Sequence, residues 1–272
     1  MTMRETRKEI PSRDLERFRA LALRMANEAR THLLALQKSG FEVQRKPDGS
    51  YVTSADFQTE QALRALVEQE FPQHGIVGEE FPARLPEAEF QWIFDPVDGT
   101  EDFVTGIPNF GTIIGLHFRG QPLIGVIDVP MLDVRVHAAY GLGAFRGQRR
   151  LQLPDLEPGT PTEHVRTMLA ARANFAKHGA WGDAHFDRIT RAYPNHRIYR
   201  TCFAHCCTAF GQTDVMIEYG NKIWDLAAAQ ILLEEAGGRY HVIQRLDAPG
   251  GAVLAAVFGK PKAVADVIAL LG

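Results

Sequence analysis

The apolar residues at the start of the chain follow the spacing of a helix. Within residues 12–38 one apolar stripe consists of Leu15, Phe18, Ala22, Met25, Ala29 and Leu33. A stripe of this kind predicts a long helix that packs on a core through one face, with Ser12 as its cap. A second helix is expected from Ser54 to Glu70, because Thr53 or Ser54 can cap its start and Pro72 follows its end.

The middle of the chain then changes to short apolar runs, which are typical of strands. We expect strands at 91–94, 111–118, 123–129, 134–139 and 143–146. A connector rich in Pro, Gly and acidic residues follows at 153–161 and marks the expected domain boundary. We therefore predict an N-terminal α+β domain over residues 1–153.

Strands and helices alternate in the remaining residues, 154–272. The expected strands are 166–171, 197–199, 214–218 and 253–257, and the expected helices are 183–192, 202–210, 225–235 and 261–271. Alternation of this kind indicates an α/β layer. The fold class predicted for the whole chain is therefore α/β, with a C-terminal α/β domain over residues 154–272.

The most informative segment is Phe94-Asp95-Pro96-Val97-Asp98-Gly99-Thr100, directly after an apolar run. Two carboxylates three residues apart at a strand end are hard oxygen ligands suited to Mg²⁺. Gly99 lets the backbone approach a ligand closely, and the N–H groups of Gly99 and Thr100 can hold a phosphate. The segment thus predicts phosphate-ester chemistry, with an ordinary surface turn as the alternative.

Two other metal motifs are excluded by spacing. An EF-hand loop needs an oxygen ligand at its fifth position and Gly at its sixth, where this chain has Gly99 and Thr100. Aspartyl-phosphate phosphatases place their two Asp residues two apart, whereas Asp95 and Asp98 are three apart. No Gly-x-Ser-x-Gly elbow and no P-loop occurs in the sequence.

Three other segments carry carboxylates at suggestive places. Gly78-Glu79-Glu80 follows the apolar pair Ile76-Val77, as at another strand end. Asp225 follows Trp224 and is expected in the first turn of a helix, where negative charge is favoured. Asp56 follows Val52-Thr53-Ser54-Ala55 and is expected inside the start of the second helix.

Together these motifs resemble the inositol monophosphatase family of Mg²⁺-dependent, lithium-sensitive phosphatases. The matching elements occur in the family's order and at its distances: Val52-Thr53-x-Ala55-Asp56, Gly78-Glu79-Glu80, Asp95-Pro96-Val97-Asp98-Gly99-Thr100, Trp224-Asp225-x-Ala227-Ala228 and Glu235-Ala236-Gly237-Gly238. With Phe103 and Gly106-x-Pro108 behind the metal loop and the segment 46–51 before Val52, the match runs from about residue 46 to 238, most of the chain. The resemblance implies a layered αβαβα sandwich with the site between its two halves, and a homodimer.

The resemblance also implies a role for each matching residue. Glu79, Asp95 and the carbonyl of Val97 would hold a first Mg²⁺, and Asp95, Asp98 and Asp225 a second. A third, weaker Mg²⁺ near Glu79 is implied by some relatives. Gly99 and Thr100 would bind phosphate through their N–H groups. Thr100 and Glu79 would orient a metal-bound water, with Asp56 coupled to the Thr100 hydroxyl, and Glu218 would contact a substrate hydroxyl.

The sequence leaves the substrate open. Residues 106–116 with 125–130 resemble the branch that hydrolyses histidinol phosphate, whereas Glu218 and the Trp224-Asp225 motif also suit inositol-1-phosphate. A nucleotide 3′-phosphatase or fructose-1,6-bisphosphatase is the alternative within the same fold. A non-catalytic metal- or phosphate-binding protein is a further alternative, although every expected metal ligand is present.

The chain departs from the family's pattern beside the metal loop and before the late helix. Glu101-Asp102 stands where relatives often carry Asn, and the two carboxylates point either toward the metals or to solvent. Relatives often carry Gly-Asp near the start of the helix after Arg200, where this chain reads Thr201-Cys202.

Composition sets the remaining expectations. The chain has 272 residues and a formal net charge of −3, and no aromatic-basic interleaving suggests a nucleic-acid partner. No apolar run approaches the roughly 20 residues that span a bilayer, so we expect a cytoplasmic protein that binds a small phosphate monoester and no membrane. Cys202, Cys206 and Cys207 are the only cysteines and are expected to be buried core residues rather than a soft-metal site.

Overall fold

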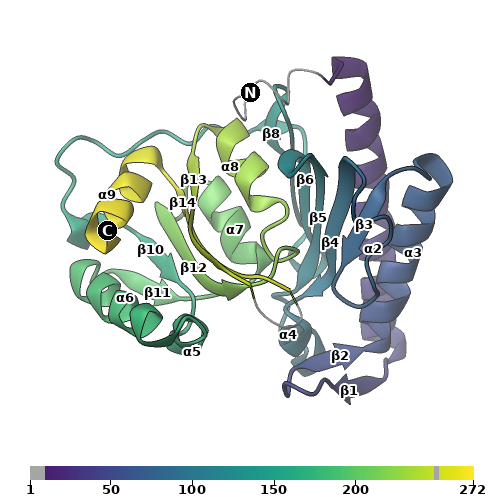
Figure 1. The fold of residues 1–272 in the computed structure, drawn as a ribbon, viewed down its shortest axis with the longest axis horizontal. Coiled ribbons are helices and arrows are strands. Elements are labelled where there is room, and N and C mark those ends of the chain that lie inside the picture. Colours follow the sequence, from purple (N-terminus) through teal and green to yellow (C-terminus); the bar gives the residue numbers. More distant parts are fainter. Residues whose placement is uncertain (1–9, 248–250) are drawn as a thin grey trace.

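The computed structural model describes residues 10–247 and 251–272 and has five layers (Figure 1). Helices α2 and α3 form the first layer, a large sheet the second, helices α7 and α8 the third, a smaller sheet the fourth, and helices α5, α6 and α9 the fifth. This order confirms the predicted αβαβα sandwich. Short 3-10 helices lie outside these layers at Pro130–Leu132 and Thr162–His164.

The large sheet contains, within the described residues, seven strands in the order β3-β4-β5-β6-β7-β8-β9. Among these seven described strands, only the pair β3 and β4 is parallel. The strands are Gly75–Gly78, Phe90–Asp98, Gly111–Phe118, Gln121–Val129, Val134–Ala139, Gly143–Arg146 and Arg149–Arg150. Helices α2 (Ser12–Ser39) and α3 (Ser54–Glu70) cover one face, and the apolar stripe of α2 is buried there as predicted.

The smaller sheet has the order β11-β10-β12-β14-β13. Strands β10, β11 and β12 are mutually parallel, and β13 and β14 join them antiparallel. The strands are Thr167–Leu169, His196–Ile198, Val215–Asn221, Arg239–Leu246 and Val253–Gly259. Its outer face is covered by α5 (Arg172–Ala176), α6 (Gly179–Ala192) and α9 (Pro261–Leu271).

Helices α7 (Cys202–Ala209) and α8 (Ala229–Ala236) lie between the two sheets and pack on both. The core around them draws buried apolar residues from both halves of the chain. Cys202, Cys206 and Cys207 are buried and unbonded to one another, as expected. The strands of the large sheet end at residue 150 and those of the smaller sheet begin at residue 167. The division into two domains at residue 153 stays a prediction.

Several local expectations were wrong. Helix α8 begins at Ala229 rather than at Asp225. Residues 223–228 form turns instead, because Asp225 accepts a hydrogen bond from the Lys222 N–H and closes the chain locally. Helix α2 is preceded by Pro11 and has no side-chain cap at its start. Strand β13 and the small hairpin of β1 (Val43–Arg45) and β2 (Tyr51–Thr53) were not predicted, because their alternating side chains are mostly exposed or polar.

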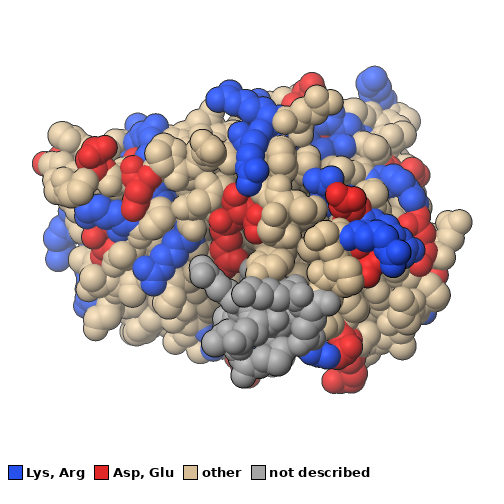
Figure 2. All heavy atoms as spheres, turned by 90° about the horizontal axis from the view of Figure 1, so that it is seen from above, with Lys and Arg blue, Asp and Glu red and all other residues tan. Residues whose placement is uncertain are grey.

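The face in Figure 2 intermixes basic and acidic side chains and shows, over its described residues, no continuous basic surface. No helix in the described ranges is both long and apolar enough to cross a membrane.

Candidate active site

The loop that ends strand β4 has a fixed backbone. Strand β4 buries Trp92, Ile93 and Phe94 on the way to Asp95. The Val97 N–H donates to Asp95 Oδ1 at 3.0 Å, which closes the turn around Pro96. Gly99 then adopts φ +81° as the N-cap of helix α4 (Thr100–Thr105), and a Cβ there would lie 2.9 Å from the Asn109 carbonyl oxygen. Only glycine fits this position without strain.

Three carboxylates from both halves of the chain meet at this loop. Asp95, Asp98 and Asp225 each offer an oxygen atom, and these atoms all lie within 4.8 Å of one another. Backbone N–H groups hold the carboxylates of Asp98 and Asp225. The Cys202 N–H donates to Asp98 Oδ2 at 2.5 Å, and the Lys222 N–H donates to Asp225 Oδ2 at 2.8 Å. The cluster is therefore fixed from behind and leaves other carboxylate oxygens available to a ligand.

The clustered carboxylates favour the binding of a cation. Burial, with the neighbouring carboxylates of Glu79 and Asp98, raises the pKa of Asp95 well above its usual range. Burial likewise raises the pKa of Asp225 to about 7, although Arg200 opposes that shift. Carboxylates packed together in this way repel one another as anions. A divalent ion with oxygen preference would relieve the repulsion, so the residues present fit Mg²⁺.

Asp56 is connected to the loop through the Thr100 hydroxyl. Helix α3 begins with a capping box in which Asp56 Oδ2 accepts from the Thr53 N–H at 2.8 Å and from the Thr53 hydroxyl at 2.6 Å. The other carboxylate oxygen lies 3.2 Å from Thr100 Oγ1, which is also 2.9 Å from the Val97 carbonyl oxygen. Burial raises the pKa of Asp56 to about 6. The side chain is thus aimed at Thr100 by its own helix cap.

Glu79 stands slightly apart from the three-carboxylate cluster. It follows strand β3, and its Oε1 lies 2.7 Å from Lys46 Nζ. The same ammonium also contacts Glu80 Oε1 at 2.7 Å. A metal ion at Glu79 would therefore compete with Lys46 for this carboxylate.

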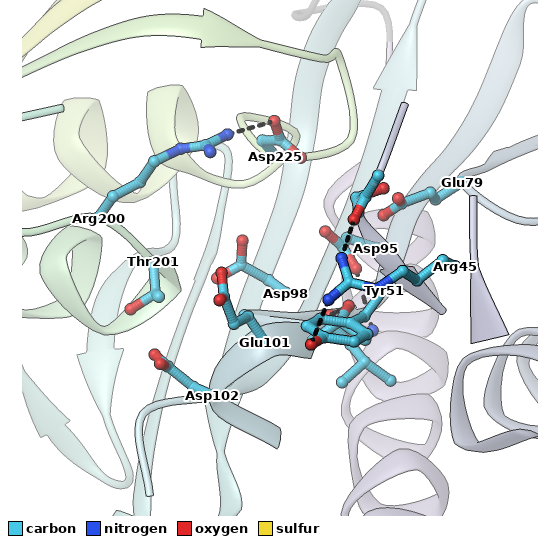
Figure 3. Close-up of a pocket in the computed structure, with 15 residues that line it drawn as sticks. Arg45, Tyr51, Glu79, Asp95, Asp98, Glu101, Asp102, Arg200, Thr201 and Asp225 are labelled. Atoms are coloured by element: carbon cyan, nitrogen blue, oxygen red, sulfur yellow. Dashed lines mark hydrogen bonds and ion pairs between the residues drawn. The ribbon is translucent and has the colours of Figure 1, made fainter. Parts of the chain in front are cut away.

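These groups open into one cavity of about 430 Å³ between the two halves (Figure 3). Of the residues predicted from the sequence, the cavity brings together Glu79, Asp95, Val97, Asp98, Gly99, Thr100 and Asp225. Glu101 and Asp102 also line it, and Asp102 accepts a hydrogen bond from the Asn109 amide at 2.9 Å. Asp56 lies behind Thr100, in contact with its hydroxyl.

Comparison with known proteins agrees with this geometry. The model of the inositol monophosphatase family matches residues 14–260. The chain belongs to the inositol monophosphatase family. Family membership makes it a relative of metal-dependent phosphatases, and Asp95, Asp98 and Asp225 could hold the metal.

Individual relatives within the family carry different names. A histidinol-phosphatase of Mycobacterium tuberculosis is 32% identical over 253 residues, which cover 90% of this chain and 94% of that protein. A fructose-1,6-bisphosphatase/inositol-1-monophosphatase of Aquifex aeolicus is 28% identical over 84% of this chain and 80% of its own length. The solved inositol monophosphatase of Anabaena (Nostoc) sp. PCC 7120 superposes with a TM-score of 0.78 at 27% identity, covering 95% of this chain and 96% of that one.

Glu218, for which the family resemblance implies a contact with a substrate hydroxyl, is not among the residues that line the cavity. The side chain is 1% exposed. Its oxygens are engaged by His205 Nε2 at 3.2 Å and by the Asn221 amide at 2.8 Å. Strand β12 places it behind Arg200, whose Nε is 3.9 Å away. The geometry therefore supports a role in holding Arg200, and a direct contact with substrate stays an untested prediction.

Sequence reasoning missed the cationic side chains of the site. Arg45 and Arg200 line the cavity on opposite sides, and Lys46 contacts Glu79. Arg45 stacks on Tyr51, with its guanidinium carbon 4.3 Å from the ring centroid. Arg200 could have been identified as a candidate site residue from its position directly before Thr201-Cys202, where the chain departs from the family's Gly-Asp pattern.

Proposed function

We propose that this chain is a Mg²⁺-dependent phosphomonoesterase that hydrolyses the phosphate ester of a small polar alcohol with a metal-activated water. One observation carries the proposal: Asp95, Asp98 and Asp225 meet in the same cavity as the backbone N–H groups at the start of helix α4. Metal ligands and a phosphate cradle side by side are what hydrolysis of a charged ester requires. Membership of a phosphatase family supports the same chemistry.

Each residue has a role in this proposal. Glu79, Asp95 and the Val97 carbonyl would hold one Mg²⁺, and Asp95, Asp98 and Asp225 a second, with Asp95 as the bridge. The binding of a third Mg²⁺ near Glu79 stays a prediction. When bound, the ions supply charge neutralisation of the ester and a lowered pKa of the attacking water. Gly99 and Thr100 would hold the phosphate through N–H groups, while Asp56 and Glu79 would fix the protons around the Thr100 hydroxyl and the water.

Inositol and histidinol are the alcohols that the sequence predicts, and relatives named for each kind of activity support both. Glu101 and Asp102 line the cavity and would suit the ammonium group of histidinol phosphate. Nucleotide 3′-phosphatase and fructose-1,6-bisphosphatase activities are the alternative. The intact set of carboxylates speaks against a non-catalytic binding protein. Lithium inhibition and a homodimer also stay predictions.

The proposal is tested by phosphate release with and without Mg²⁺. A panel of histidinol phosphate, inositol-1-phosphate, 3′-phosphoadenosine 5′-phosphate and fructose-1,6-bisphosphate covers the substrate classes. Release that requires Mg²⁺ and stops with EDTA is expected for at least one of them. A preference of about 100-fold in kcat/KM, or about 2.7 kcal/mol, would identify the substrate. Absence of metal-dependent release from every ester would contradict the proposed function.

A further inference from the structure

The walls of the cavity limit where the alcohol part of a substrate can lie. A reacting phosphate must face the cluster of Asp95, Asp98 and Asp225 and the N–H groups at Gly99 and Thr100. Three walls remain for the alcohol: the β1–β2 hairpin with Arg45 and Tyr51, the segment at Arg200 and Thr201, and the acidic pair Glu101 and Asp102 of helix α4 (Figure 3). Two of these walls thus carry an arginine, and the third carries two carboxylates.

Arg200 is held in one orientation. Its Nε and Nη2 donate to Asn221 Oδ1 at 3.2 and 2.8 Å, and Nη2 is also 3.3 Å from Asp225 Oδ2. Within residues 10–247 and 251–272, no acceptor lies within hydrogen-bond distance of Nη1. Since the side chain lines the cavity and is 40% exposed, this edge of the guanidinium is available to a ligand.

Buried polar groups behind Arg200 explain its fixed position. Asn221 and Glu218 are each 1% exposed, and the Asn221 amide donates to Glu218 Oε2 at 2.8 Å. His205 contacts the other oxygen of Glu218. A guanidinium keeps its proton throughout the physiological pH range, and Asn221 and Asp225 hold this one in place. A permanent, positioned cation therefore faces the part of the cavity that the alcohol occupies.

We propose that Arg200 binds a second anionic group, a carboxylate or a further phosphate, on the alcohol part of the substrate. The inference rests on the proposed phosphatase function and narrows its substrate class. A guanidinium edge matches the geometry of carboxylate and phosphate oxygens. The ammonium group of histidinol phosphate would be repelled by Arg200 and could bind only at the opposite charge of Glu101 and Asp102. The reacting phosphate has its own cradle at helix α4, so Arg200 is available to a different group.

Three esters of comparable size test the inference. Glycerate 2-phosphate carries a carboxylate on its alcohol, glycerol 2-phosphate carries no second charge, and histidinol phosphate carries an ammonium group. With Mg²⁺, kcat/KM is expected to be roughly 10- to 100-fold higher for glycerate 2-phosphate than for glycerol 2-phosphate, as for a hydrogen bond between charged groups. Histidinol phosphate cannot use Arg200 and is expected to be a poorer substrate than glycerate 2-phosphate.

Arg200→Gln isolates the contribution of the guanidinium. The preference for glycerate 2-phosphate over glycerol 2-phosphate is expected to collapse to within about twofold, mainly through KM. Arg197→Gln is the matched control: it removes the same charge three residues away, on an exposed part of strand β11, and should keep the preference. Calorimetric binding of glycerate 2-phosphate with Ca²⁺ in place of Mg²⁺ should weaken in Arg200→Gln and not in Arg197→Gln.

The outcomes separate this inference from the proposed function. Equal or better hydrolysis of the neutral or cationic ester by the unmodified enzyme would overturn the inference and leave the phosphatase function standing. A uniform loss on all three esters in Arg200→Gln would also overturn it, because Arg200 would then act on the reacting phosphate or on Asp225. Metal-dependent release from none of the esters here or in the earlier panel would contradict the proposed function itself.

Discussion

The two sides of the cavity are built in different ways. On the first side, Asp95, Asp98, Gly99 and Thr100 lie within one short loop, and backbone geometry fixes them. On the second side, Asp225 and Arg200 come from separate segments and depend on contacts with Asn221 and Lys222. The first side carries most of the groups suited to the chemistry, whereas the second adds one proposed metal ligand, Asp225, and carries Arg200, which is suited to the choice of alcohol. Short-range sequence therefore encodes the reaction more completely than it encodes the substrate.

The largest effect is expected on the first side. Asp95→Asn should lower kcat by on the order of 10³-fold, because it removes the charge of the ligand proposed to bridge both metal ions. The fold should survive, since the Asn side-chain carbonyl can still accept from the Val97 N–H. Phosphate-release kinetics at saturating Mg²⁺ measure the loss.

Thermal unfolding of the same variant separates chemistry from folding. Without metal, the melting temperature should hold or rise, because the repulsion between Asp95 and its neighbouring carboxylates is relieved. Asp247→Asn, at an exposed position, serves as the matched control with unchanged kcat. Near-normal turnover in Asp95→Asn would contradict the metal assignment on both sides of the cavity.

A pH effect on stability is expected from the core behind the first side. His74 lies between the rings of Phe71 and Phe90, and its Nδ1 accepts from Trp92 Nε1 at 3.1 Å. Burial lowers the pKa of His74 from 6.5 to about 4. Because the unfolded chain binds the proton first, the free energy of unfolding should fall as pH drops from 6.5 to about 4, by about 3 kcal/mol in total.

Denaturant unfolding between pH 7.5 and pH 4 measures how much the titration of His74 changes the free energy of unfolding. His74→Gln can still accept from Trp92 but no longer titrates, so its stability should depend less on pH even where its absolute stability is lower. Parallel pH dependences for the two proteins would show that His74 contributes no such term.

A smaller effect is expected at the turn that forms the phosphate cradle. Gly99 and Gly106 flank helix α4 with φ of +81° and +76°, so alanine is strained at both. Among the described residues, the new Cβ at Gly99 would lie 2.9 Å from the Asn109 carbonyl oxygen, whereas none of their atoms lies within 4 Å of a Cβ at Gly106. Gly99→Ala should therefore cost about 1–3 kcal/mol more stability than Gly106→Ala and should also raise KM. Equal losses of stability in the two variants would mean that the close approach of the Asn109 carbonyl oxygen to Gly99 adds nothing to the cost of the substitution.

The contrast between the two sides of the cavity also explains which features could be predicted from the sequence. The αβαβα layers and the apolar stripe of helix α2 were predicted, because periodic burial and family motifs both report on them. The loop from Asp95 to Thr100 was predicted as one unit, because its spacing alone defines a turn. The position of Glu218 behind Arg200 was not, because it depends on how strand β12 packs against α7. Likewise, the start of α8 depends on a hydrogen bond of Asp225 that no periodicity reports.

The smallest effect is expected at the helix cap that positions Asp56. The Thr53 hydroxyl accepts from the Ala55 N–H at 3.1 Å and donates to Asp56 Oδ2 at 2.6 Å. Thr53→Ala should destabilise the protein by about 1 kcal/mol, as loss of an N-cap does. It should also lower kcat modestly, because Asp56 loses the hydroxyl that holds it toward Thr100.

Thr53→Ser should restore both properties, since it returns the hydroxyl. Thr190→Ala, which removes a hydroxyl bonded to the Phe186 carbonyl within helix α6, controls for the loss of any threonine. Because Thr53 belongs to the first side alone, the preference between glycerate 2-phosphate and glycerol 2-phosphate should stay unchanged in Thr53→Ala. A shift in that preference would show that the two sides of the cavity do not act independently.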